Sequence, residues 1–147
     1  TTDGGQCYFR YHDGRFFNGL VAVAFELVDV SSDDGGFACI PGSHKANIPL
    51  PEDLRQSASQ DDLSSMVTKV GVSSGDAIIF TEALTHGTLP WEVDEKRTTV
   101  FYKFSPHALT WSADFFNPDD FVGYEDMNRR KLALLEKPNA RYPQRPR

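Results

Sequence analysis

The sequence is poor in the features that mark secreted, membrane-spanning and disulfide-rich proteins. It has two cysteines among 147 residues, Cys7 and Cys39, and they form no CxxC pair. Such sparse cysteine usage is typical of a reducing compartment, so we expect a cytoplasmic protein. No apolar run approaches the roughly 18 residues of a membrane span, and no basic start precedes an apolar segment as in a secretion signal. We therefore expect no membrane partner.

Positive charge is also scarce. Fifteen Lys and Arg side chains stand against 21 Asp and Glu side chains, a formal net charge of −6. The basic residues form no stripe, and binding to phosphates depends on clustered Lys and Arg, so we expect no nucleic-acid partner. Histidine is rare as well, which leaves few candidates for a metal site: His12, His44, His86 and His107.

Short apolar segments separated by turn residues are abundant. Hydrophobic residues make up 39% of the chain and aromatic residues 12%, as in a folded globular protein. About seven short strands and one closing helix, from Asn128 to about residue 136, favour an all-β sandwich or barrel. We expect a single domain over residues 1–147, with extended tails at 1–6 and 138–147. The clearest predicted strands cover residues 7–11, 20–30, 37–40, 66–72, 77–80 and 98–104.

The longest apolar segment, residues 20–30, is rich in valine and predicts a central strand. Glu26 and Asp29 lie near its end, where we expect the chain to emerge into solvent.

His86 and Arg97 lie eleven residues apart between two predicted strands. His86 is followed by Gly87 in an expected turn, and Arg97 begins the segment that leads into strand 98–104. A guanidinium held one antiparallel strand away from an imidazole can place a carboxylate beside a metal. Strand alternation puts Arg97, Thr99, Phe101 and Lys103 on one face. If that face is interior, Arg97 needs an anion; the alternative is a surface ion pair with Glu92, Asp94 or Glu95.

His12 and Asp13 supply an imidazole and a carboxylate close together. With His86 they would complete the two-histidine, one-carboxylate set that suits ferrous iron. The alternative is that Asp13-Gly14 is a plain hairpin turn. Adjacent strand residues point to opposite faces, so His12 and Asp13 can share a metal only if the turn breaks the alternation.

Four stretches resemble the phytanoyl-CoA dioxygenase family of Fe(II)- and 2-oxoglutarate-dependent oxygenases. They are DGGFACIPGSHK at residues 34–45, GDAIIF at 75–80, His86-Gly87, and Arg97 with its strand. The resemblance implies a double-stranded β-helix, a jelly-roll and cupin-like barrel. It also implies that His86 is the distal iron ligand and that Arg97 pairs with the distal carboxylate of the cosubstrate 2-oxoglutarate.

The chain departs from the family pattern at the remaining ligands. The family has His-x-Asp just before the strand that corresponds to residues 20–30, whereas this chain has His12-Asp13-Gly14. His12 and Asp13 could reach iron in a non-standard way, or the site could be degenerate because the first part of the fold is missing. A third alternative is a halogenating relative, in which a small residue replaces the carboxylate.

The resemblance implies an oxygenase that hydroxylates a small organic substrate, with Fe(II) as cofactor. A non-enzymatic jelly-roll module that binds a small carboxylate is the alternative. The chain does not begin with methionine, and family members usually carry helices before the barrel that are absent here. We therefore expect that the natural start is missing or was removed, and that another copy covers the exposed apolar surface in a homodimer.

Overall fold

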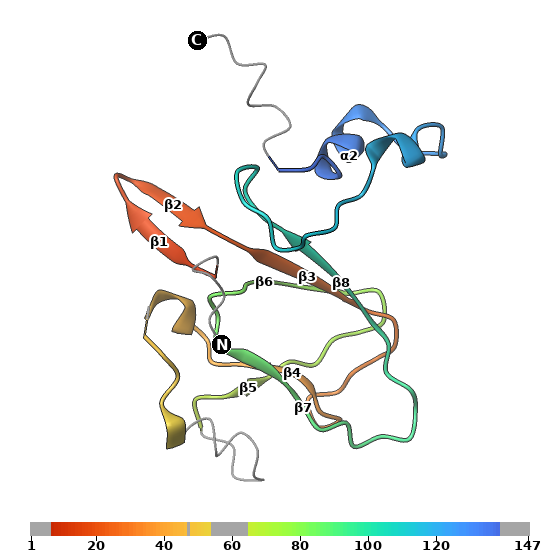
Figure 1. Cartoon of the computed structure of the whole chain (residues 1–147). Coiled ribbons are helices and arrows are strands. Elements are labelled where there is room, and N and C mark those ends of the chain that lie inside the picture. The colour runs from red at the N-terminus through yellow and green to blue at the C-terminus, as the bar shows by residue number, and fades with distance from the viewer. Residues whose placement is uncertain (1–6, 47, 54–64, 139–147) are drawn as a thin grey trace. The chain divides into compact units, whose positions relative to one another are not determined.

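The structure, a computed structural model, describes residues 7–46, 48–53 and 65–138 (Figure 1). The chain separates into two compact units, Thr1–Phe104 and Ser105–Arg147. The first unit contains every named strand, and the second contains α2 (Arg129–Leu134). The single-domain assignment stays a prediction, and the tails predicted at 1–6 and 138–147 lie almost entirely outside the described residues.

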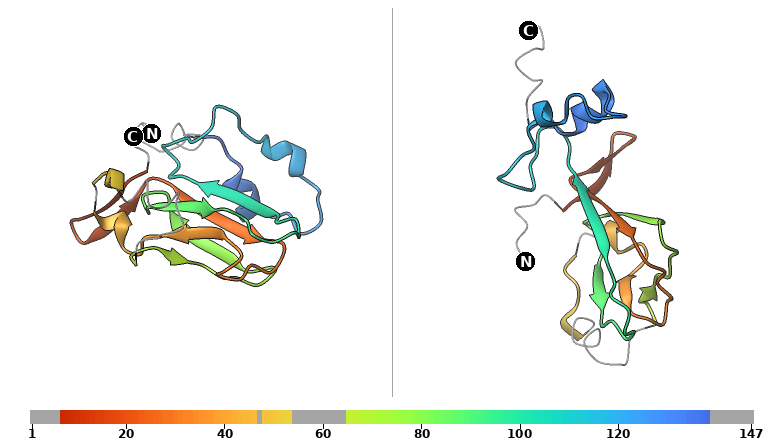
Figure 2. Two further views of the ribbon diagram at one scale, coloured as in Figure 1. Left: turned by 90° about the horizontal axis from the view of Figure 1, so that it is seen from below. Right: turned by 90° about the vertical axis from the view of Figure 1, so that its right-hand side faces the viewer.

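Antiparallel pairing in the first unit forms three separate sheets within the described ranges. One is a hairpin of β1 and β2, and the others have the orders β6-β3-β8 and β5-β4-β7. Figures 1 and 2 show the two three-stranded sheets facing each other. The mostly β class with a short helix near the end is confirmed, but hydrogen bonding does not close the described strands into a barrel. The strands are β1 (Phe9–His12), β2 (Arg15–Asn18), β3 (Val21–Glu26), β4 (Gly36–Cys39), β5 (Thr68–Lys69), β6 (Ala77–Thr81), β7 (His86–Leu89) and β8 (Thr99–Phe104).

The strand β3 is central, as predicted, because it pairs with both β6 and β8. Its alternation turns Ala22, Ala24 and Glu26 inward, and all three are at most 1% exposed. The expectation that Glu26 emerges into solvent is therefore wrong. Glu26 shares the inward face with the two alanines, and an arginine described below meets its charge there.

Aromatic rings from both sheets meet over the small side chains of β3. Phe80 of β6 and Phe37 of β4 lie with ring centroids 4.8 Å apart and form one buried cluster with Ala22 and Ala24. Alanine leaves room for the two rings, and burying a Phe side chain contributes roughly 1.5–3 kcal/mol. The cluster joins the sheets at the place where His86 also packs.

The His12-Asp13-Gly14-Arg15 segment is a two-residue hairpin turn. His12 pairs with Arg15, and Asp13 and Gly14 both have positive φ, 51° and 73°. Positive φ at both central residues is the type I′ pattern that Asp-Gly favours. The hairpin-turn interpretation of Asp13-Gly14 is confirmed, while β2 after it was not predicted.

The expected His-Gly turn at His86 is wrong, because His86 is the first residue of β7. β7 pairs with β4, with His86 opposite Cys39. The sequence HGTL has little strand preference of its own, so pairing with β4 determines this strand.

The second unit contains the helix predicted after Asn128. The side chain of Asn128 accepts hydrogen bonds from the backbone N–H groups of Arg130 and Lys131, at 3.0 and 3.1 Å. A short 3₁₀ turn, η2 (Pro118–Phe121), precedes it. In the described part of the chain, no helix has the length and apolarity needed to cross a membrane.

Candidate metal and cosubstrate site

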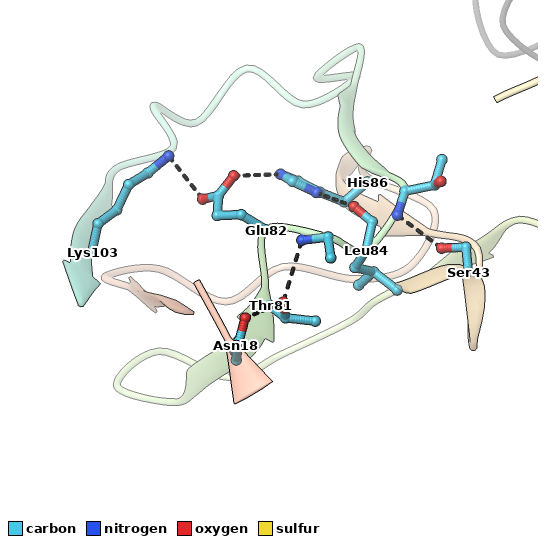
Figure 3. A network of polar contacts seen from close by, with 9 residues as sticks. Asn18, Ser43, Thr81, Glu82, Leu84, His86 and Lys103 are labelled. Atoms are coloured by element: carbon cyan, nitrogen blue, oxygen red, sulfur yellow. Dashed lines mark hydrogen bonds and ion pairs between the residues drawn. The ribbon is translucent and has the colours of Figure 1, made fainter. Parts of the chain in front are cut away.

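His86 lies between the two sheets with a defined ring orientation. Its ring is 4.6 Å from that of Phe80 and 5.8 Å from that of Phe37, centroid to centroid. Its Nδ1 atom is 2.7 Å from the carbonyl oxygen of Leu84 (Figure 3). A carbonyl can only accept, so Nδ1 carries the proton and donates it. This leaves the Nε2 lone pair available, which is how histidines that bind metals are commonly held.

Glu82 is the acidic side chain that accompanies His86 (Figure 3). Its Oε2 atom lies 3.8 Å from His86 Nε2, and its Oε1 atom lies 2.8 Å from Lys103 Nζ. The Glu82 side chain is only 10% exposed. Neither Glu82 nor Lys103 was predicted from the sequence as a member of this site. The available signals were the four-residue spacing from Glu82 to His86 and the predicted face that Lys103 shares with Arg97.

A turn at the end of β6 holds Glu82 in place. Leu84 N–H donates to the carbonyl of Thr81 at 2.9 Å, and the Thr81 hydroxyl donates to Asn18 Oδ1 at 2.8 Å. Ala83 N–H donates to the same hydroxyl at 3.3 Å. These bonds position the segment that carries both Glu82 and the carbonyl that orients His86.

Arg97 meets its anion inside the protein. Its guanidinium forms a two-point contact with the Glu26 carboxylate, through Nη2 to Oε1 and through Nε to Oε2, the latter at 3.2 Å. The Thr99 hydroxyl also donates to Glu26 Oε2, at 2.7 Å. The partner of Arg97 is thus a buried strand residue and not one of the loop acids considered above.

The predicted alternation of β8 is confirmed by these contacts. Arg97 and Thr99 direct their side chains to the buried carboxylate of Glu26, and Lys103 directs its side chain to the half-buried carboxylate of Glu82. One face of this segment therefore presents two cations to the space between the sheets. Cations on an interior face can bind an anionic ligand when they are not fully neutralised.

His12 and Asp13 lie at the exposed tip of the β1–β2 hairpin. Their side chains are 58% and 92% exposed, and His12 Nδ1 is 3.1 Å from Asp13 Oδ2. The His12 ring stacks on Phe17, with centroids 4.4 Å apart. Among the described residues, no group of three or more His, Cys, Asp and Glu side chains is arranged to hold a metal ion. The structure does not gather His12, Asp13 and His86 into a three-ligand site, and their joint assignment stays a prediction.

A mainly apolar hollow of about 120 Å³ adjoins His86. Burial raises the pKa of the Cys39 thiol in its wall, so this thiol stays protonated near neutral pH. The hollow could accept a small, largely apolar group next to the imidazole. It is lined by Ala38, Cys39, Ile40, Leu50, Val67, Thr85, His86, Gly87, Thr88 and Leu89.

This chain is similar to known proteins over 59% to 69% of its length. Dioxygenase lolE1 from Epichloe uncinata is 30% identical over 87 residues, 59% of this chain and 32% of that protein. HygX from Streptomyces hygroscopicus, solved with nickel, 2-oxoglutarate and hygromycin B bound, is 33% identical with a TM-score of 0.59. That match covers 69% of this chain and 41% of HygX. HygX with iron bound matches at 31% identity with a TM-score of 0.58.

This chain spans less than half the length of these relatives. The profile of the family described as phytanoyl-CoA dioxygenase (PhyH) matches residues 6–99, more than half of the chain. The matched region includes β1 to β7, His86 and Arg97. The chain belongs to the phytanoyl-CoA dioxygenase family of Fe(II)- and 2-oxoglutarate-dependent dioxygenases.

Proposed function

We propose that this chain carries part of the active site of an Fe(II)- and 2-oxoglutarate-dependent oxygenase that hydroxylates a small organic substrate. The observation that carries the proposal is His86, whose Nδ1–H group is bound to the Leu84 carbonyl so that Nε2 can accept a metal. Family membership and the iron-bound and 2-oxoglutarate-bound structures of HygX support it. The two facing sheets support a double-stranded β-helix for the complete fold.

Each polar residue has a distinct part in this proposal. His86 binds the metal, and Arg97 binds a carboxylate of 2-oxoglutarate. Glu26 orients the guanidinium and holds it until the cosubstrate competes for its donors. The described residues fit the metal only in part, because a three-ligand set is not formed among them. A bound ferrous ion would supply the chemistry that activates dioxygen.

Binding of iron by the protein under anaerobic conditions tests this proposal. In equilibrium dialysis with Fe(II), we expect the wild-type chain to take up iron and 2-oxoglutarate to increase its affinity. His86→Ala should abolish uptake, whereas His107→Ala, which removes a histidine from the second unit, should not. Arg97→Lys should weaken the effect of 2-oxoglutarate more than iron binding itself, since Lys cannot provide the two-point contact. Absence of iron uptake by the wild-type chain would refute the proposal.

A non-enzymatic jelly-roll module that binds a small carboxylate is the second candidate function. The observation that favours it is that His12 and Asp13 are exposed and that the described residues form no three-ligand cluster. This function requires 2-oxoglutarate or a similar dicarboxylate to bind without metal. Calorimetry with and without Fe(II) separates the two candidates, because an oxygenase needs the metal for tight cosubstrate binding and the module does not.

We further propose that the protein forms a homodimer through the outer face of the β6-β3-β8 sheet. Ile79 is 70% exposed on this face and Tyr102 is 53% exposed. Tyr102 lies edge-on to Phe25, with ring centroids 6.1 Å apart. An apolar sheet face of this kind is commonly covered by protein. Light scattering that shows a single monomeric species at high concentration would contradict the dimer.

A further inference from the structure

His86 Nε2 and Glu82 Oε2 lie close together without a hydrogen bond between them. Two electron-pair donors point toward each other there at 3.8 Å. Because His86 Nδ1 already carries a proton that is bound to the Leu84 carbonyl, Nε2 of a neutral ring has no hydrogen to donate. Even a protonated ring would be too far away for a hydrogen bond, which needs a nitrogen–oxygen distance of about 2.7–3.2 Å.

A divalent cation placed between these atoms would satisfy both donors. Bonds of imidazole nitrogen and carboxylate oxygen to such an ion are roughly 2.0–2.2 Å long, so two of them can span about 4 Å. The observed separation of 3.8 Å falls within this reach. Both side chains are partly shielded from solvent, with His86 26% and Glu82 10% exposed.

Lys103 holds the carboxylate in the orientation that metal binding requires. It engages Oε1 at 2.8 Å and leaves Oε2 directed at His86. Carboxylates that bind metals are commonly held by such a second contact. By contrast, Asp13, the carboxylate proposed from sequence, is 92% exposed at a hairpin tip.

We propose that Glu82 is the carboxylate ligand of a divalent metal ion shared with His86, in the role that sequence analysis assigned to Asp13. The inference rests on the proposed metal-dependent function and specifies which side chain of this chain completes the pair. The other coordination positions belong to the cosubstrate, to water or to further donors.

Four versions of the full chain test this inference: wild type, Glu82→Gln, Lys103→Met and Asp13→Asn. Affinity is measured for Fe(II) by anaerobic equilibrium dialysis, and Co(II) added alone reports the ligand set through its visible absorption. Glu82→Gln should bind Fe(II) at least about tenfold more weakly and change the Co(II) spectrum. Lys103→Met keeps the carboxylate but removes the contact that orients it, so it should bind Fe(II) less weakly than Glu82→Gln does and keep the wild-type Co(II) spectrum. Asp13→Asn should retain the wild-type affinity. Circular dichroism shows whether each variant is folded.

Three results would overturn the inference. If Glu82→Gln binds Fe(II) as tightly as the wild type, Glu82 is not a metal ligand. If Glu82→Gln and Lys103→Met lose equal Fe(II) affinity, the Glu82–Lys103 ion pair has only a structural role. A loss confined to Asp13→Asn returns the role to Asp13 while the proposed function stands. If Glu82 proves necessary for metal binding but 2-oxoglutarate has no effect on it, the inference stands and the oxygenase proposal fails. A wild-type chain that binds neither metal refutes both.

Discussion

The guanidinium of Arg97 makes a two-point contact with the carboxylate of Glu26, a residue 71 positions earlier in the sequence. Glu26 is 1% exposed and the Arg97 side chain 15%, so the pair is largely removed from water. The contact joins the end of β3 to the segment that leads into β8. Gly36 lies against the guanidinium, because a Cβ added there would be 3.5 Å from Arg97 Nε and Cζ. The arginine that we propose for cosubstrate binding is thus also part of the core.

Breaking this pair from one side should strongly destabilise the protein. Arg97→Met leaves the Glu26 carboxylate buried without its cation, and removing one partner of a buried ion pair costs about 3–5 kcal/mol. The double variant Glu26→Met/Arg97→Met should be closer to wild type, because no buried charge is left. Urea unfolding of the two single variants and the double variant measures the coupling. If the two single losses simply add in the double variant, the pair is not coupled.

Gly35 should tolerate no side chain at all. It has a φ of +97°, and an added Cβ would lie 1.9 Å from the carbonyl oxygen of Pro90. That atom belongs to the backbone and cannot rotate away, so Gly35→Ala should cost on the order of 3 kcal/mol or more. Gly14→Ala is the matched control: its φ is +73° but the space is open, so about 1–2 kcal/mol is expected. Comparable unfolding midpoints for the two variants would contradict the close approach of Gly35 to the backbone of Pro90.

Local signals in the sequence predicted several elements correctly. The valine-rich run predicted β3, Asp13-Gly14 predicted the hairpin turn, and Asn128 predicted the start of α2. Each signal is contained within a few neighbouring residues. The alternation that placed Arg97 and Lys103 on one face also held, because it depends only on a continuous strand.

The parts that sequence analysis missed depend on partners far away in the chain. From the sequence, Glu26 was expected at the end of a strand, in solvent. Its carboxylate can be buried because Arg97 forms an ion pair with it. The HGTL segment forms a strand because β4 is available to pair with it. Glu82 belongs to the site because the turn after β6 places it there and Lys103 of β8 forms an ion pair with it.

The N-cap of α2 gives a prediction for the second unit. Asn128 Oδ1 accepts two backbone N–H groups, and replacing such a cap by alanine costs about 1 kcal/mol. We expect Asn128→Ala to increase hydrogen exchange of the α2 amides, whereas Asn128→Asp should preserve their protection. Equal exchange in the alanine variant and the wild type would show that the cap does not limit opening of this helix.

The neighbouring residues Phe80 and Ile79 test how the core supports His86. Phe80 is 8% exposed and packs on the His86 ring at 4.6 Å, whereas Ile79, on the opposite face of β6, is 70% exposed. Phe80→Ala should cost about 3–5 kcal/mol because it leaves a cavity between the sheets. Ile79→Ala, measured in dilute protein so that association does not contribute, should cost far less. Phe80→Ala should also shift the NMR signals of the His86 ring, since one of its aromatic neighbours is lost. Similar losses of stability in the two variants would contradict the inward orientation of Phe80 and the packing that positions His86.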